Sequence, residues 1–163
     1  MAKKKWRDQV GASIASTMRL VEPYAGTDRT VIADSRFGSC SCLEWLWDEF
    51  HLHSILAVKT AHAGFPKKTL REALGDKRGA NATMKVKALL ERGETEYYAS
   101  GVLDKKPMYV VSTCGTSIVT HVAMRGEKGK KIEVPFPEMN ALYRKYFNGI
   151  DRFNRDCFGP KSV

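Results

Sequence analysis

The segment that decides the fold runs from Thr30 to Lys59 and reads TVIADSRFGSCSCLEWLWDEFHLHSILAVK. Its first residues, 30–33, form a short apolar, β-branched run that predicts a buried strand ending at Asp34. A capping-box pattern at 41–44 then predicts the start of a helix. That helix has one apolar face at helical spacing, made of Leu43, Leu46, Trp47 and Phe50. The run 54–59 predicts a second strand, and a strand, helix and strand at this spacing indicate an α/β fold.

The flanking segments extend this pattern in both directions. Apolar residues at helical spacing predict a helix over 10–21, and a short helix ends at Gly75. The polar, basic stretch 76–95 predicts a loop, with a helix near 84–90.

Three short strands are expected next, at 96–102, 108–113 and 117–123, as an antiparallel meander. A charged linker follows at 125–131. A last helix over 138–156 carries a strong apolar stripe.

The composition bounds the class of protein. A chain of 163 residues with 43% apolar residues is a globular domain, and it has no apolar run long enough to span a bilayer. No apolar segment follows the basic amino terminus, so we expect no secretory signal. There are 27 Lys and Arg against 18 Asp and Glu, and a net charge of +9 attracts phosphate backbones. The same charge also fits a merely well-solvated basic face.

Four cysteines and two nearby histidines raise the question of a metal site. Cys40 and Cys42 lie close in sequence to His51 and His53. The predicted helix places the two pairs at its opposite ends, and a single residue between two cysteines is not the usual zinc-finger gap. Reduced thiols, buried or at the surface, are the expectation.

Two carboxylates stand out by their placement. Asp34 ends a buried strand, where a side chain points into a cleft, and Asp151 lies at the edge of the apolar stripe of the last helix. If that helix packs on the sheet, the two carboxylates can meet at a divalent ion. The alternatives are a turn cap for Asp34 and a surface pair with Arg155 for Asp151.

Three segments together carry a family resemblance. VIADSRFGS at 31–39, YVVSTC at 109–114 and YFNGIDRF at 146–153 resemble, in order and spacing, three segments of piggyBac-like DNA transposases. The first and third contain the second and third catalytic aspartates of that family. No one of the three is specific, but the ordered set covers nearly the whole chain.

The resemblance implies a partial RNase H-like fold interrupted by a small α+β insertion that contains the antiparallel meander. The RNase H-like parts would be 1–62 and 134–163, and the insertion 63–133. It further implies Mg²⁺ as the cofactor, with Asp34 and Asp151 as catalytic metal ligands and Asn154 as a neutral oxygen ligand one turn later. The implied partner is DNA, cut at TTAA targets through hairpin intermediates. The resemblance also implies a homodimer, a nuclear location and no small-molecule substrate.

The sequence departs from the family pattern at three positions. Only Asp8 and Asp28 precede Asp34, and neither follows a convincing strand, so the first catalytic aspartate is expected to be missing. Asn154 stands where many relatives carry a carboxylate, and Arg36 stands where an aromatic residue is common. We therefore expect a fragment or degenerate copy of the catalytic domain that does not cut DNA by itself.

Two alternatives remain open at this point. The chain can be a non-catalytic DNA-binding module, in which Arg36 and a basic face bind phosphates; that face comprises Lys77, Arg78, Lys85, Lys87 and Arg92. It can also be a protein-interaction domain. In that case Trp45, opposite the core stripe that holds Trp47, would belong to an exposed aromatic patch, although a core position for Trp45 is the favoured expectation.

Overall fold

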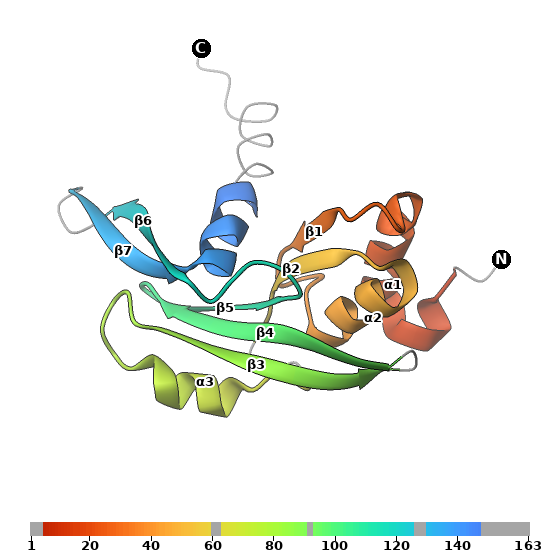
Figure 1. Cartoon of the computed structure of the whole chain (residues 1–163), viewed down its shortest axis with the longest axis horizontal. Coiled ribbons are helices and arrows are strands. Elements are labelled where there is room, and N and C mark those ends of the chain that lie inside the picture. The colour runs from red at the N-terminus through yellow and green to blue at the C-terminus, as the bar shows by residue number, and fades with distance from the viewer. Residues whose placement is uncertain (1–4, 60–62, 91–92, 126–129, 148–163) are drawn as a thin grey trace, which may run out of the picture.

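The computed structural model of the protein describes residues 5–59, 63–90, 93–125 and 130–147. Its centre is a five-stranded mixed sheet of order β1-β2-β5-β4-β3, and β6 and β7 form a separate two-stranded sheet (Figure 1). The labelled elements are α1 (Arg7–Val21), η1 (Glu22–Tyr24), β1 (Thr30–Ala33), α2 (Cys40–Phe50), β2 (His53–Ala57), α3 (Lys67–Leu74), β3 (Asn81–Leu90), β4 (Gly93–Leu103), β5 (Pro107–Ser112), β6 (Val119–Arg125) and β7 (Lys131–Pro137). A last helix begins at Glu138 and is described to Phe147. The α/β prediction is confirmed.

The strand, helix and strand predicted between residues 30 and 59 form a parallel unit. β1 pairs parallel with β2, with Thr30 opposite His53 and Ala33 opposite Leu56. Parallel neighbours need a crossover connection, and α2 provides it. The unit places the carboxyl ends of both strands at the same edge of the sheet.

The start of α2 differs from the prediction by two residues. Ser39, and not Ser41, is the N-cap, because the Ser39 hydroxyl accepts a hydrogen bond of 3.0 Å from the backbone N–H of Cys42. The helix ends at His51, whose left-handed conformation lets its N–H bond the carbonyls of Leu46 and Trp47. Ser41 and Glu44 therefore lie inside the helix.

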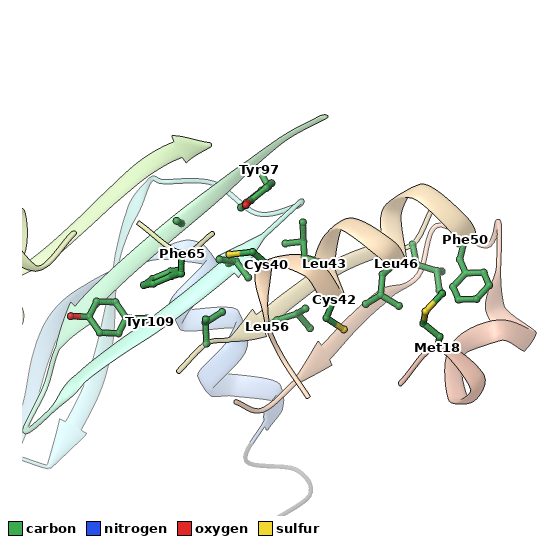
Figure 2. Packing of buried hydrophobic residues seen from close by; sticks show 14 of the residues in the cluster. Met18, Cys40, Cys42, Leu43, Leu46, Phe50, Leu56, Phe65, Tyr97 and Tyr109 are labelled. Atoms are coloured by element: carbon green, nitrogen blue, oxygen red, sulfur yellow. The ribbon is translucent and has the colours of Figure 1, made fainter. Parts of the chain in front are cut away.

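The sheet is covered on both faces. Leu56, Tyr109 and Val111 point to one face, where they join Leu43 and Leu46 of α2 in the main core (Figure 2). Their neighbours along the strands point to the other face, where Ile55, Ala57 and Val110 meet Tyr143 of the last helix. This alternation follows from the two-residue repeat of strands. The central strands are therefore apolar on both sides, as the continuous hydrophobic runs predicted.

Trp45 packs on the core as favoured, and only Trp47, expected in the core stripe, differs from its predicted role. Trp45 packs partly buried against the main core, and Trp47 is half-buried against the rings of His51 and His53. The fully buried stripe of α2 instead includes Cys42, because the helix is rotated from the predicted orientation.

Two strands of the meander were predicted, since β4 and β5 correspond to the expected strands 96–102 and 108–113, but its first strand was not. β3, β4 and β5 pair antiparallel in sequence order, and the predicted loop and helix between 76 and 95 are wrong, because 81–90 is a strand. Along β3, Lys85 and Lys87 point outward while Val86 and Ala88 pack on the core. This alternation is the strand signal that the basic composition concealed.

The third predicted strand joins a second sheet. β6 pairs antiparallel with β7, and not with β5, and β7 occupies 131–137, part of which was expected to be a linker. Val134 and Phe136 of β7 pack with Val102 of β4 in a third core cluster. The two-stranded sheet is thereby fixed to the main sheet.

The expected insertion is continuous with the rest of the fold, since β5 pairs directly with β2. The domain limits and the RNase H-like comparison stay predictions. None of the described helices is long and apolar enough to cross a bilayer.

Candidate functional site at the strand ends

Asp34 lies immediately after β1 and organises a tight turn. Its carboxylate Oδ1 accepts a hydrogen bond of 3.0 Å from the backbone N–H of Arg36, and its carbonyl accepts bonds from Phe37 and Gly38. This is the turn-capping role that the sequence left open as an alternative. One carboxylate oxygen still has free lone pairs when the other accepts a single N–H, so capping does not exclude metal binding.

Gly38 brings this turn close to the end of β2. A Cβ placed on Gly38 would lie 2.1 Å from the carbonyl oxygen of Ala57, which is closer than any real contact. Glycine is therefore required at this position for steric reasons. The close approach holds the Asp34 turn against the carboxyl end of β2.

A cavity of about 540 Å³ opens at these strand ends. We call it the strand-end cavity. In open α/β sheets, the carboxyl ends of parallel strands are the usual place for a ligand. Its lining comes from the Asp34 turn, β2, the start of β5 and the last helix, and consists of Ser35, Ala57, Val58, Lys106, Pro107, Met108, Tyr109, Tyr143, Arg144 and Phe147.

Cations and aromatic rings dominate the side chains around the strand-end cavity. Tyr143 and Phe147 stack with ring centroids 5.1 Å apart and planes at 11°. Lys106 and Arg144 add two positive charges, and the Arg144 guanidinium lies 3.9 Å from the carboxylate of Asp104. Such a surface suits an anionic ligand with flat apolar groups, the combination that nucleic acids present.

The other predicted metal ligands fall outside the part of the chain that the structure describes. Asp151 and Asn154 follow Phe147, the last described residue of its helix. The strand-end cavity nevertheless brings the helix that leads to Asp151 and the turn that holds Asp34 to one opening, since Phe147 and Ser35 both line it. Within residues 5–59, 63–90, 93–125 and 130–147, no three His, Cys, Asp or Glu side chains gather as a metal site.

Arg36 is exposed, and its guanidinium lies 5.8 Å from the ring centre of Phe37. Among the described residues, no ion pair joins its guanidinium to the Asp34 carboxylate; the only contact between the two residues is through the Arg36 backbone. Arg36 therefore remains accessible to an external anion.

Three of the other predicted DNA-binding residues form ion pairs with carboxylates of the protein itself. Lys85 pairs with Glu96, Lys87 lies 2.8 Å from Glu94, and Arg78 Nε donates a bond of 2.7 Å to Asp104. Hydrogen bonds to Glu94 and Glu96 raise the pKa of Lys87, and the hydrogen bond from Lys85 lowers the pKa of Glu96. Lys77 is exposed, and Arg92 lies outside the described residues. Much of the positive charge of the predicted face is thus neutralised within the protein.

The cysteine and histidine pairs lie as predicted at opposite ends of α2. Cys40 begins that helix, and His51 and His53 follow its end. Eleven helical residues separate the two ends by about 16 Å, too far for one metal ion. Burial raises the pKa of both helix thiols, and that of Cys42 to about 12, so both stay protonated at neutral pH.

The family is shown by comparison with known proteins. A family model described as Transposase IS4 matches residues 2–158. An α/β domain with a basic cavity at its parallel strand ends is in keeping with that class of DNA-processing protein, and the chain belongs to this transposase family. Transposases of this type usually use a divalent metal and act on DNA. No curated protein and no solved structure matches the chain.

Sequence reasoning identified Asp34, whose turn contributes Ser35 to the strand-end cavity, but missed the other residues that line the cavity. Tyr143 and Phe147 were assigned to the apolar stripe of the last helix, and nothing local to the sequence indicated that this stripe lines a cavity. Lys106 appeared only as part of a turn. Their common location depends on which strands become neighbours, and β5 lies beside β2 only through long-range pairing.

Proposed function

We propose that this chain is part of the catalytic domain of a piggyBac-like DNA transposase and that the strand-end cavity is where it holds a DNA strand. The observation that carries the proposal is the composition of that cavity. Its lining joins the turn after Asp34 to the last helix and adds two cations and two stacked rings. The match to a transposase family over residues 2–158 supports the same function.

In this proposal Asp34, Asp151 and Asn154 supply oxygen ligands to Mg²⁺. Asp34 fits this role because the turn fixes one of its oxygens and the residue lies at a strand end. A bound divalent ion activates the attacking oxygen and stabilises the leaving oxygen in phosphoryl transfer. Lys106 and Arg144 would neutralise the phosphate, and the partly exposed ring of Phe147, supported by the buried ring of Tyr143, would contact sugar or base.

We further propose that the chain alone binds DNA without cutting it. Of the two aspartates that precede Asp34, Asp8 lies in the first turn of α1 and Asp28 lies before β1 with a left-handed backbone. Neither follows a strand beside β1, so neither matches the first aspartate of the family. A nuclear location and a homodimer are parts of the same proposal and rest on the piggyBac resemblance.

The experiment compares the wild-type chain with Asp34→Asn and with Asp28→Asn as a matched control. Asparagine tolerates the left-handed backbone of Asp28, so the control keeps its fold. Calorimetric titration with Mn²⁺, together with a nicking assay on a TTAA duplex and a DNA hairpin, measures metal binding and cleavage separately. We expect Asp34→Asn to weaken Mn²⁺ binding at least about tenfold, Asp28→Asn to leave it unchanged, and no nicking by any of the three.

Two results would contradict different parts of the proposal. If Asp34→Asn and Asp28→Asn bind Mn²⁺ equally, Asp34 is not a metal ligand. If the wild-type chain nicks DNA and Asp34→Asn does not, the metal site is right and the claim of inactivity is wrong.

A further inference from the structure

Three cations of α3 share one groove on the surface. Lys67, Lys68 and Arg71 line a groove of about 400 Å³ together with Phe65, Pro66 and Thr69. Leu70 and Leu74 are buried and anchor α3 on the sheet, so the rest of this short helix faces outward. We call Lys67, Lys68 and Arg71 the α3 cationic face.

The charge of this face is not neutralised by neighbouring carboxylates. No ion pair joins Lys67, Lys68 or Arg71 to an acidic side chain within the described part of the chain, and Glu72 is the one carboxylate of α3. On β3, by contrast, Lys85 forms an ion pair with Glu96, and Lys87 forms one with Glu94. The positive charges of the β3–β4 hairpin are thus neutralised within the protein, whereas those of α3 are available to an external anion.

The positions of the lysines are unfavourable for the helix itself. Lys67 and Lys68 occupy the first turn of α3, which has no acidic residue and no side-chain cap. The positive end of the helix dipole repels cations there. A local arrangement that costs stability and has no structural compensation is typical of a functional surface.

The groove at the α3 cationic face is connected to the strand-end cavity only through the core, and the two share no lining residue. Phe65, which lines the groove, packs edge-on against Tyr109 with ring centroids 5.3 Å apart, and Tyr109 also lines the cavity. Lys106 lies on the cavity wall. The rings of Phe65 and Tyr109 are both buried in the main core, whereas the last helix packs on the other face of the sheet, so the α3 cationic face is a surface separate from the strand-end cavity.

We propose that the α3 cationic face binds the sugar-phosphate backbone of DNA. This inference rests on the proposed function, and it gives the chain a second DNA contact, distinct from the basic face predicted around β3. Side chains of this kind contact phosphates without selecting sequence, so the contact sets orientation and overall affinity. The occupant is DNA because three cations without carboxylate partners among the described residues complement a polyphosphate backbone, and the partner of the family is DNA.

The test is the salt dependence of duplex binding, measured by fluorescence anisotropy. Each phosphate contact by a cation contributes about 0.9 to the slope of log affinity against log salt concentration. We expect the triple variant Lys67→Gln, Lys68→Gln and Arg71→Gln to reduce the slope by about 2 to 3. The matched control is the double variant Lys85→Gln and Lys87→Gln. It removes two cations that are already paired with carboxylates of the protein, so we expect the slope to change by less than about 1.

A variant that adds a positive charge tests the same inference even if the triple variant does not fold. Thr69 is exposed in the same groove, and Thr69→Lys adds one cation without removing a contact. We expect Thr69→Lys to increase the slope by about 1. Circular dichroism of every variant confirms that the fold is intact.

The inference is overturned if the triple variant keeps the wild-type slope, or if the control loses as much as the triple variant. It is also overturned if vesicles containing phosphatidylserine bind the wild-type chain more tightly than duplex DNA does and lose this binding in the triple variant. Failure of the proposed function looks different: Mn²⁺ binding is then independent of Asp34 while the α3 variants still alter DNA affinity. Absence of any salt-dependent DNA binding by the wild-type chain rejects both.

Discussion

At one end of the five-stranded sheet, β1 and β2 lie against α2, and at the other end β3 and β4 extend as a long hairpin (Figure 1). The first end is held by burial: Leu43 and Leu46 of α2 and Leu56 of β2 are completely inaccessible to water. The outer face of the hairpin is held by pairs of opposite charge, such as Lys87 with Glu94. The end that carries Asp34 is therefore the rigid one, as a site that must keep its geometry requires.

This contrast predicts very different sensitivities to substitution at the two ends. Buried apolar contacts each contribute several times more to folding than exposed charge pairs do. Three substitutions, taken from the largest expected effect to the smallest, test it.

Leu46→Ala should have the largest effect, because it removes a fully buried side chain from the main core (Figure 2). We expect the free energy of unfolding to fall by about 2 to 5 kcal/mol, measured by urea denaturation. The matched control is Leu89→Ala on the hairpin, where the leucine is 87% exposed, and it should change stability by less than about 0.5 kcal/mol. Equal losses for the two variants would remove the distinction between the ends.

Ser39→Ala should have an intermediate effect, because it removes the hydroxyl that accepts the Cys42 N–H at the start of α2. We expect a loss of about 0.5 to 2 kcal/mol in the free energy of unfolding. Ser41→Ala is the control, since Ser41 is exposed inside the helix and caps nothing. A larger loss for Ser41→Ala would restore the capping box that the sequence suggested.

The same contrast explains how much the sequence could predict. The segment 30–59 was predicted well because β2 is buried on both faces and its helix has one apolar stripe, so local pattern and tertiary environment agree, although β1, at the sheet edge, is less buried than expected. Strand β3 of the hairpin was not, because Lys85 and Lys87 made it look like a basic loop. Only the pairing with β4 gives those lysines carboxylate partners.

The candidate site was predictable only in part, for a related reason. Asp34 was identified from the abrupt end of a strand, which is a local signal. The cations Lys106 and Arg144 lie 38 residues apart (144 minus 106) and meet only because the last helix packs on the face opposite α2. The α3 cationic face had a local signal in Lys67, Lys68 and Arg71, whose spacing places them on the outside of a helix with Leu70 and Leu74 buried.

Glu96→Gln should have the smallest effect and the clearest pH dependence. The hydrogen bond from Lys85 lowers the pKa of the Glu96 carboxyl from its usual 4.5, so ionised Glu96 stabilises the folded chain. For a lowered pKa this stabilisation is fully present above pH 4.5 and disappears as the pH falls through the folded-state pKa.

The loss caused by Glu96→Gln should therefore be smaller than that of Ser39→Ala at pH 7, vanish in acid, and shrink in high salt, as thermal unfolding can measure. Glu133→Gln on β7 is the matched control, because Glu133 is exposed and forms no ion pair within the described residues. If Glu96→Gln exceeded Ser39→Ala at neutral pH, the charge pairs of the hairpin would be structural supports comparable to the cap of α2. The protein would then have two rigid ends instead of one.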